Sequence, residues 1–275
     1  MEELKGKTIA ITGATGALGQ EICFALAKEG ANLIFVDRNL EKSKALAQKI
    51  MSAFPQTKVE NIKCDLLSLD DVKKAQKTLL GMNFDVLFLN SGIFNVPLVK
   101  NEFGLNNVFQ VNFLSQYYLA RKLLEDGHKL KKIVAMGSIA YRSVKYDEDD
   151  FDYSNGKAQQ TYGISKKFLI YSLFGLGERF SSVEISIAHP GITATQLTTK
   201  NNKFLKRLMK IIFPSVKKAG RSAVCAICEH CEKFFWFGPP IFDVYGKPRQ
   251  KRLKIDKQEF ELVLQKTEGL YKSLL

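Results

Sequence analysis

A glycine-rich segment near the amino end, residues 8–19 with the sequence TIAITGATGALG, constrains the fold more than any other stretch. It opens with a short apolar run without charge, typical of a strand buried on both faces of a parallel sheet. Gly13, Gly16 and Gly19 then lack the Cβ atoms that would keep an anionic ligand from the backbone, and residues 17–28 continue with a helical pattern. A strand, a glycine turn and a helix in that order predict a site for the pyrophosphate of a dinucleotide. The competing interpretation is a plain turn between two core elements.

A second strand, at residues 33–36, ends in an acidic residue, Asp37. An acid at this position can accept hydrogen bonds from the ribose hydroxyls of an adenosine. Asp37 would repel a 2′-phosphate, whereas the neighbouring Arg38 could reach out and pair with one. The pair therefore favours NAD(H) as cofactor and leaves NADP(H) as the alternative.

Strand-like and helix-like patterns alternate along the rest of the chain. The spacing predicts strands at residues 59–62, 84–89, 132–136 and 183–188, and helices at 41–51, 68–80, 105–125 and 157–180. No repeat or linker interrupts them in a chain of 275 residues. This alternation predicts an α/β protein with a doubly wound parallel sheet, formed by a single domain over residues 1–275.

Composition limits the class of protein. Apolar residues at 45% and charged residues at 25% are ordinary for a soluble globular protein. Because the chain starts without an apolar leader and holds no run of about 18 apolar residues, we expect a cytoplasmic protein. Cys225, Cys228 and Cys231 are spaced for one helix face and lack a fourth cysteine, so we expect reduced packing thiols and no metal site.

Polar and small residues follow the predicted strands at their carboxyl ends, where open α/β sheets place their ligands. The third strand is followed by Asp65 and Leu66, the fourth by the run Asn90-Ser91-Gly92, and the fifth by Ser138. Asp65 has two competing roles, contact with the adenine amino group and capping of the next helix.

Tyr162 and Lys166 lie four residues apart on a predicted helix and therefore share one face. A phenol is a poor base at neutral pH, but an adjacent ammonium favours the phenolate. Tyr162 could then remove the proton of an alcohol or return it to a ketone, while Ser138 holds the substrate oxygen. A Tyr-x3-Lys pair alone also occurs by chance on exposed helix faces.

In combination these motifs resemble the short-chain dehydrogenase/reductase family. TGATGALG, Asp65-Leu66, Asn90-Ser91-Gly92, Asn112, Ser138, Tyr162-x3-Lys166 and Pro190-Gly191-x3-Thr195 occur in that family's order. The acidic loop around residues 150–153 and the tail at residues 256–270 resemble its retinol-dehydrogenase-like branch. Two departures are that Ala17 occupies the usual place of the middle glycine, and that Leu89 replaces the first Asn of Asn-Asn-Ala-Gly.

The resemblance implies a Rossmann fold and an NAD(P)-dependent oxidoreductase that interconverts an alcohol and its ketone or aldehyde. Its catalytic residues would be Asn112, Ser138, Tyr162 and Lys166, with Asn112 organising a water that relays protons to Lys166. The implied cofactor contacts are Thr12, Gly13, Thr15, Gly16, Ala17, Leu18, Gly19, Asp37, Arg38, Asp65, Leu66, Asn90, Ser91, Gly92, Tyr162, Lys166, Pro190, Gly191 and Thr195. The alternative function is a catalytically inactive dinucleotide-binding regulatory protein. A homodimer is a possible assembly of the chain.

Positive charge gathers late in the chain, where residues 196–254 carry a local net charge of +11 out of +13 overall. Within it, residues 196–214 match the position of the family's substrate lid, and their apolar residues imply a hydrophobic substrate. The lysines threaded through them are either solvated or lie on an anionic membrane surface. Nucleic-acid binding is not expected, because the segment lacks the aromatic pattern of a known module.

Overall fold

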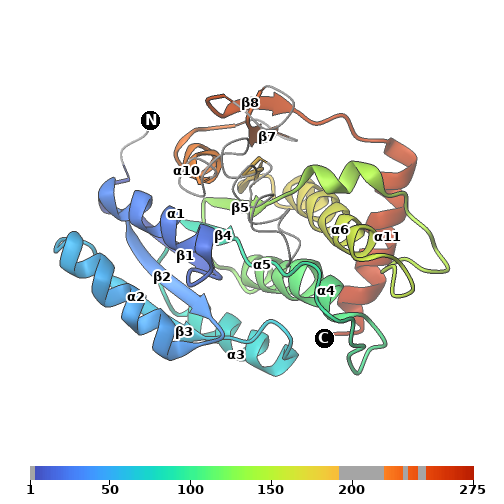
Figure 1. The fold of residues 1–275 in the computed structure, drawn as a ribbon, viewed down its shortest axis with the longest axis horizontal. Helices are drawn as coiled ribbons and strands as arrows, with labels where there is room; N and C mark the ends of the chain where they lie inside the picture. The colour runs from blue at the N-terminus through green and yellow to red at the C-terminus, as the bar shows by residue number, and fades with distance from the viewer. Residues whose placement is uncertain (1–3, 192–219, 232–234, 241–245) are drawn as a thin grey trace, which may run out of the picture.

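The described residues form one eight-stranded β-sheet, with strand order β3-β2-β1-β4-β5-β6-β7-β8. The computed structural model describes residues 4–191, 220–231, 235–240 and 246–275 (Figure 1). The strands are β1 (Thr8–Thr12), β2 (Asn32–Asp37), β3 (Val59–Lys63), β4 (Val86–Leu89), β5 (Lys132–Met136), β6 (Glu184–Ala188), β7 (Phe235–Gly238) and β8 (Arg249–Arg252). All neighbouring pairs are parallel except β7 and β8, which are antiparallel. The doubly wound parallel sheet is therefore confirmed.

Side chains of successive strand residues enter two separate apolar cores, one on each face of the sheet. In β1, Ile9 and Ile11 belong to one core and Ala10 to the other. Residues in β2 and β4 alternate in the same way, because side chains of a strand point to opposite faces with period two. Burial on both faces explains why these strands have uninterrupted apolar sequences.

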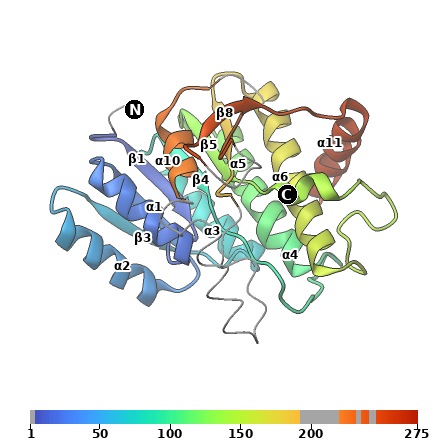
Figure 2. The same ribbon diagram turned by 45° about the horizontal axis from the view of Figure 1, so that its top comes forward.

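Helices cover both faces. Helices α1 (Ala17–Lys28), α2 (Leu40–Ala53) and α10 (Arg221–Cys228) contribute to one core. On the other face lie α3 (Leu69–Leu80), α4 (Asn107–Phe109), α5 (Ser115–Glu125), α6 (Ala158–Arg179) and α11 (Lys257–Lys272). Figures 1 and 2 show α11 running beside α6, at the end of the molecule opposite α1 and α2. Two further turns are a π-helix, η1 (Gln110–Leu114), and a 3-10 helix, η2 (Ile139–Ser143).

Most predicted elements lie within a few residues of their expected positions, and three differences are notable. The helix expected at 105–125 is α4, η1 and α5 in succession, because η1 inserts a π-helical turn. Ser68, not Asp65, caps α3 by accepting a hydrogen bond from the Asp71 amide, so the capping alternative for Asp65 is wrong. Cys231 lies beyond the end of α10, so the three cysteines do not share one helix face.

Two predictions from the sequence concern residues that the structure does not describe. Thr195 and the lid segment at residues 196–214 lie outside the described residues.

The described end of the basic segment contributes the edge strand β8, whose charged residues discourage pairing with another sheet. Among the described helices, none has the length and apolar character needed to cross a membrane. The five cysteines are free thiols.

Candidate active site

A cleft of about 540 Å³ opens at the carboxyl ends of the parallel strands. Most of the predicted cofactor residues line it: Gly13, Thr15, Gly16, Ala17, Leu18, Gly19, Asp37, Arg38, Asp65, Leu66, Asn90, Ser91, Gly92, Tyr162, Lys166 and Pro190. The cleft crosses the border of β1 and β4, where the chain's crossovers change direction along the sheet. Such switch points are where doubly wound sheets bind ligands.

The glycine turn needs its glycines at specific places. Gly13 has a φ of +69°, and a Cβ built there would lie 2.6 Å from the Ser91 hydroxyl oxygen. Any other residue at position 13 would therefore be strained and would displace Ser91. Gly16 caps α1 without a side-chain hydrogen bond, so no side chain competes with a ligand for the helix N-terminus.

Asp37 lies at the end of β2 and is almost entirely buried, at 3% exposure. Its Oδ1 accepts hydrogen bonds from the Thr15 hydroxyl at 2.9 Å and the Thr15 amide at 3.4 Å. Its Oδ2 is buried without a hydrogen-bond partner. Burial raises the pKa of this carboxyl group, and the Thr15 hydrogen bonds oppose the rise. An acceptor of this kind fits a ligand that brings a hydroxyl group, as the ribose of a dinucleotide would.

Thr12 lies beneath the turn and is fully buried. Its hydroxyl oxygen accepts from the amides of Asn90 at 3.0 Å and Ser91 at 3.1 Å. The Asn90 side chain donates in return to the carbonyls of Thr12 at 3.1 Å and Gly13 at 3.0 Å. Thr12 and Asn90 therefore fix two strand ends against each other, and Thr12 supports the cleft from below.

Asn112 occupies the middle of the π-helical turn η1 and has no exposed surface. Its Oδ1 accepts from the Ile93 amide at 2.7 Å, and its Nδ2 donates to the Ile93 carbonyl at 3.0 Å and the Ser165 hydroxyl at 3.1 Å. The side chain thus joins the segment after β4 to α6. Single π-helical turns inside α-helices are frequent at functional sites.

Tyr162 and Lys166 project from α6 into the same cleft. Lys166 is 2% exposed, and its ammonium donates to the Met136 carbonyl at 2.8 Å. Burial lowers the pKa of Lys166 to about 8. The ammonium lies 5.8 Å from the centre of the Tyr162 ring. The two groups therefore share the cleft wall without a direct hydrogen bond.

Burial raises the pKa of Tyr162, and a hydrogen bond with Ser138 opposes the rise. The sequence predicts that Lys166 favours the phenolate, but the causes that set the pKa of Tyr162 here are burial and the Ser138 hydrogen bond, and burial favours the phenol. Ser138 lies two residues after β5 and caps η2, where its hydroxyl accepts from the Ala140 amide at 3.3 Å. Ser138 is placed at the phenol by this cap and is not part of the described cleft lining.

Several residues of this site are not among those that the sequence predicts. Lys42 lines the cleft beside Arg38, and the Phe94 ring meets the Tyr162 ring edge-on with centres 5.0 Å apart. Gln116 and Ser165 are buried hydrogen-bond partners of the predicted residues. Gln116 lies four residues after Asn112 and Ser165 three after Tyr162, so helical spacing was the available signal.

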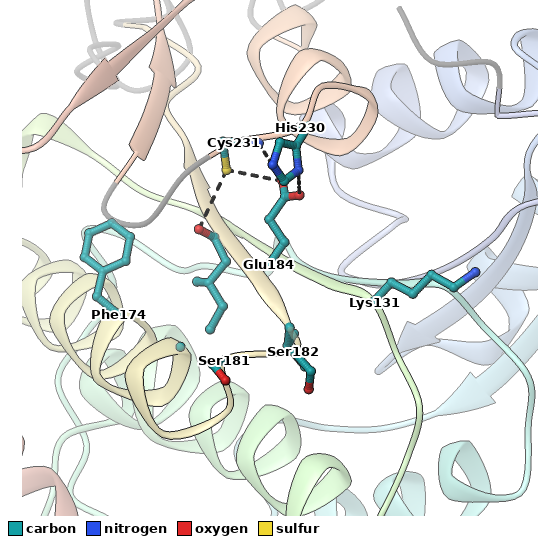
Figure 3. A pocket seen from close by; sticks show the side chains of 10 residues that line it. Lys131, Phe174, Ser181, Ser182, Glu184, His230 and Cys231 are labelled. Carbon is teal, nitrogen blue, oxygen red and sulfur yellow. Dashed lines mark hydrogen bonds and ion pairs between the residues drawn. The ribbon is translucent and has the colours of Figure 1, made fainter.

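A second cavity, of about 480 Å³, lies at the amino end of β6 (Figure 3). Glu184 at its wall accepts from Lys132 at 2.6 Å, from His230 at 2.6 Å and from the Cys231 amide at 3.0 Å. None of the predicted site residues that the structure describes lines this cavity. Across the described parts of the chain, no three His, Cys, Asp or Glu side chains are grouped to hold a metal ion.

Comparisons with known proteins agree with the geometry of the cleft. The family model for short chain dehydrogenase matches residues 7–206. Human retinol dehydrogenase 13 is 29% identical over 205 residues, which are 70% of this chain and 61% of that protein. An uncharacterized oxidoreductase from Schizosaccharomyces pombe is 29% identical over 230 residues, covering 77% of this chain and 68% of the other. This chain thus spans about three fifths of the length of retinol dehydrogenase 13.

Solved structures share the fold at lower identity. An uncharacterized protein from Mycobacterium Paratuberculosis has a TM-score of 0.77 and 21% identity, covering 100% of this chain and 95% of the other. The L-sorbose reductase of Gluconobacter frateurii, complexed with NADPH and L-sorbose, has a TM-score of 0.63 and 18% identity over 84% and 92% of the two chains. Because the family model covers well over half of the sequence, from the glycine turn past the Tyr162 helix, this chain belongs to the short-chain dehydrogenase family.

Proposed function

We propose that the protein is an NAD(P)-dependent oxidoreductase that interconverts an alcohol and its ketone or aldehyde. The observation that carries this proposal is the position of Tyr162 and Lys166 on the wall of the same cleft as the glycine turn. The unpartnered Oδ2 of Asp37 and the close packing at Gly13 make the turn suitable for a dinucleotide. When bound, the nicotinamide ring accepts a hydride from the alcohol carbon or returns one to the carbonyl carbon.

Tyr162 is proposed to move the proton that accompanies the hydride. In the reductive direction its phenol gives a proton to the carbonyl oxygen, and in the oxidative direction its phenolate takes the hydroxyl proton of the alcohol. A phenol is protonated at neutral pH, which is the form that reduction needs, and burial, which raises the pKa of Tyr162, favours that form further. Oxidation needs the phenolate, which burial opposes.

Ser138, Lys166 and Asn112 are proposed to support this transfer. The Ser138 hydroxyl hydrogen-bonds to Tyr162, so a substrate oxygen that replaces this bond would be held by both hydroxyl groups. Lys166 brings a buried positive charge that can bind ribose hydroxyl groups or compensate a phenolate. Asn112 fixes Ile93 and Ser165, and through them the distance between the strand end and α6.

We propose NAD(H) as the preferred cofactor. A buried carboxylate at Asp37 would repel a 2′-phosphate, and its open Oδ2 can accept from a ribose hydroxyl instead. Arg38 and Lys42 line the same end of the cleft and could pair with a phosphate, so they carry the NADP(H) alternative.

We propose a hydrophobic substrate. Leu67, Ile93, Phe94 and Val111 line the cleft, and Phe94 lies directly against the ring of Tyr162. An apolar wall beside the proton-transfer group favours an apolar alcohol or carbonyl compound over a sugar. Cytoplasmic location, a homodimer and membrane contact through the lid remain predictions of the sequence.

The test is an activity screen followed by one substitution. Purified protein is mixed with NADH or NADPH and a panel of apolar and polar ketones and aldehydes, and the absorbance of the reduced nicotinamide is followed. We expect turnover that Tyr162→Phe lowers by about 10²–10⁴-fold while cofactor binding is kept. Binding of the cofactor with no turnover on any substrate, in either direction, would favour the regulatory protein. Full activity of Tyr162→Phe would refute the proposed mechanism.

A further inference from the structure

Gln116 is a fully buried glutamine in the first turn of α5, directly after the π-helical turn. It does not line the cleft, and the chemistry proposed above makes no use of it. Its side chain nevertheless contacts both the glycine-turn strand and the segment that carries Asn112. A buried side-chain amide is costly unless its hydrogen bonds are satisfied, so its partners indicate its role.

The hydrogen bonds of Thr12 determine how the amide of Gln116 is oriented. The Thr12 hydroxyl oxygen already accepts from the amides of Asn90 and Ser91, which uses both of its lone pairs. Its single proton therefore goes to Gln116 Oε1, at 2.9 Å. This fixes the Gln116 Nε2 group on the opposite side, away from Thr12.

Three backbone carbonyls surround that Nε2 group. It donates to Ser91 O at 3.0 Å, Asn112 O at 3.1 Å and Val111 O at 3.2 Å. Val111 and Asn112 belong to the π-helical turn, whereas Ser91 belongs to the strand end next to the glycine turn. Two hydrogens serve three acceptors, so at least one of these bonds is bifurcated.

The contacts continue from Asn112 to the proton-transfer helix. Asn112 Nδ2 donates to the Ser165 hydroxyl, and the Ser165 hydroxyl donates to the carbonyl of Tyr162 at 2.7 Å. Thr12, Gln116, Asn112 and Ser165 therefore form a continuous buried chain of hydrogen bonds from β1 to α6.

We propose that Gln116 is a positioning residue that couples the dinucleotide turn to the catalytic turn of α6. The coupling rests on the proposed function, because it states how binding at the glycine turn sets the geometry around Tyr162. Among these hydrogen-bonded residues, Gln116 is the one whose side chain contacts Thr12, Ser91 and the π-helical turn. Removing its amide would break the link between Ser91 and the π-helical turn, so that Asn112 would hold this segment through Ile93 alone.

The test compares Gln116→Leu with a matched control, Gln76→Leu. Gln76 on α3 is also a buried glutamine at 3% exposure, and its side chain donates to Asp126 Oδ2 at 2.9 Å, outside the cleft. Both variants lose a buried amide of the same size, so both lose stability. We expect only Gln116→Leu to accelerate hydrogen exchange at the amides of Asn90, Ser91 and Ile93, by about tenfold or more.

Two further readouts separate coupling from simple damage. The dissociation constant for reduced cofactor, measured by its fluorescence, should rise by about tenfold in Gln116→Leu and by less than about twofold in Gln76→Leu. Gln116→Glu, which keeps the acceptor for Thr12 and loses both donors, should behave like Gln116→Leu at high pH and regain affinity relative to the wild type as pH falls. Burial disfavours the charged form of a carboxyl group, and protonation of the new carboxylate would restore one donor.

A double-mutant cycle with Thr12→Val completes the experiment. Because Thr12 and Gln116 act through one hydrogen bond, their effects on cofactor affinity should be less than additive. Equal exchange rates at residues 90–93 in both leucine variants, or strictly additive losses in the cycle, would overturn the coupling. Absence of oxidoreductase activity in the wild-type protein would refute the proposed function. The hydrogen-exchange comparison would still test the coupling, because it needs neither cofactor nor turnover.

Discussion

Glu259, on the C-terminal helix α11, offers a sharp test of what holds the catalytic helix in place. Its Oε1 accepts from the Lys167 ammonium at 2.6 Å and from the Tyr146 amide at 2.7 Å. Lys167 is the neighbour of Lys166 on α6, and Tyr146 follows the η2 turn that Ser138 caps. One carboxylate therefore joins the two segments that carry the proton-transfer residues.

The size of the effect follows from burial. The Lys167 side chain is 5% exposed and that of Glu259 is 19% exposed. Removing one partner of a buried ion pair typically costs about 3–5 kcal/mol. Glu259→Gln keeps an acceptor for the Tyr146 amide, and the Lys167 ammonium keeps the Val144 carbonyl at 2.6 Å. We therefore expect a loss of about 3 kcal/mol, at the lower end of that range. For a domain of this size this corresponds to a fall in Tm of about 6–12 °C.

The assay is thermal unfolding followed by circular dichroism, with Glu261→Gln as control. Glu261 is an exposed acid on the same helix, so the same change there should move Tm by less than about 2 °C. Glu259→Gln should also lower kcat, since α6 and the η2 segment lose their common partner. Equal Tm values for the two variants would show that the Glu259 ion pair contributes nothing to stability and would refute the reasoning from burial.

Three further predictions concern the cleft. Tyr162→Phe should lower turnover by about 10²–10⁴-fold with little change in cofactor affinity, as steady-state kinetics and cofactor fluorescence would show; unchanged turnover contradicts the acid/base role. Lys166 has a pKa of about 8 in the folded protein, below its ordinary value of 10.5, so its burial costs stability below pH 8 and the cost disappears as pH rises to about 10.5. Lys166→Met should therefore raise Tm at pH 7 without added cofactor, and this difference in Tm from the wild type should disappear at pH 10. The same variant should lose activity. A lower Tm than that of the wild type at pH 7 would mean that the buried charge is compensated. Asp37→Ser should shift the ratio of kcat/KM values toward NADP(H) by about tenfold or more, whereas an unchanged ratio would assign the choice to Arg38.

The parallel core of the sheet could be predicted because its strands are recognisable on their own. The run Ile9-Ala10-Ile11 is apolar on both faces. A continuous apolar run is typical of a strand that helices cover on both sides. β8 could not be predicted in this way. Its sequence Arg-Gln-Lys-Arg has no apolar pattern, and it becomes a strand only by pairing with β7.

Local chemistry in the site was harder to read than the identity of its residues. The predicted Tyr162 and Lys166 do share the cleft wall, but the sequence gives no sign that Met136 provides the partner of the ammonium. The π-helical turn is equally hidden, because one inserted residue changes the helical period too little to be seen in a short apolar pattern. For Asp65 and Ser68, both good capping residues, the choice depends on where helical geometry begins.

The contacts of α11 also bear on the order in which the protein is made. Arg121 binds Glu268 across 147 residues of sequence, and Tyr271 binds Glu125 across 146. The partners of the glycine turn, by contrast, have all been synthesised once residue 116 has emerged. At ordinary rates of translation, α11 follows about 7–30 seconds later. A growing chain can therefore assemble its dinucleotide turn well before the outer face of α6 is covered, and during that interval the apolar residues that later meet α11 stay open to chaperones or to aggregation.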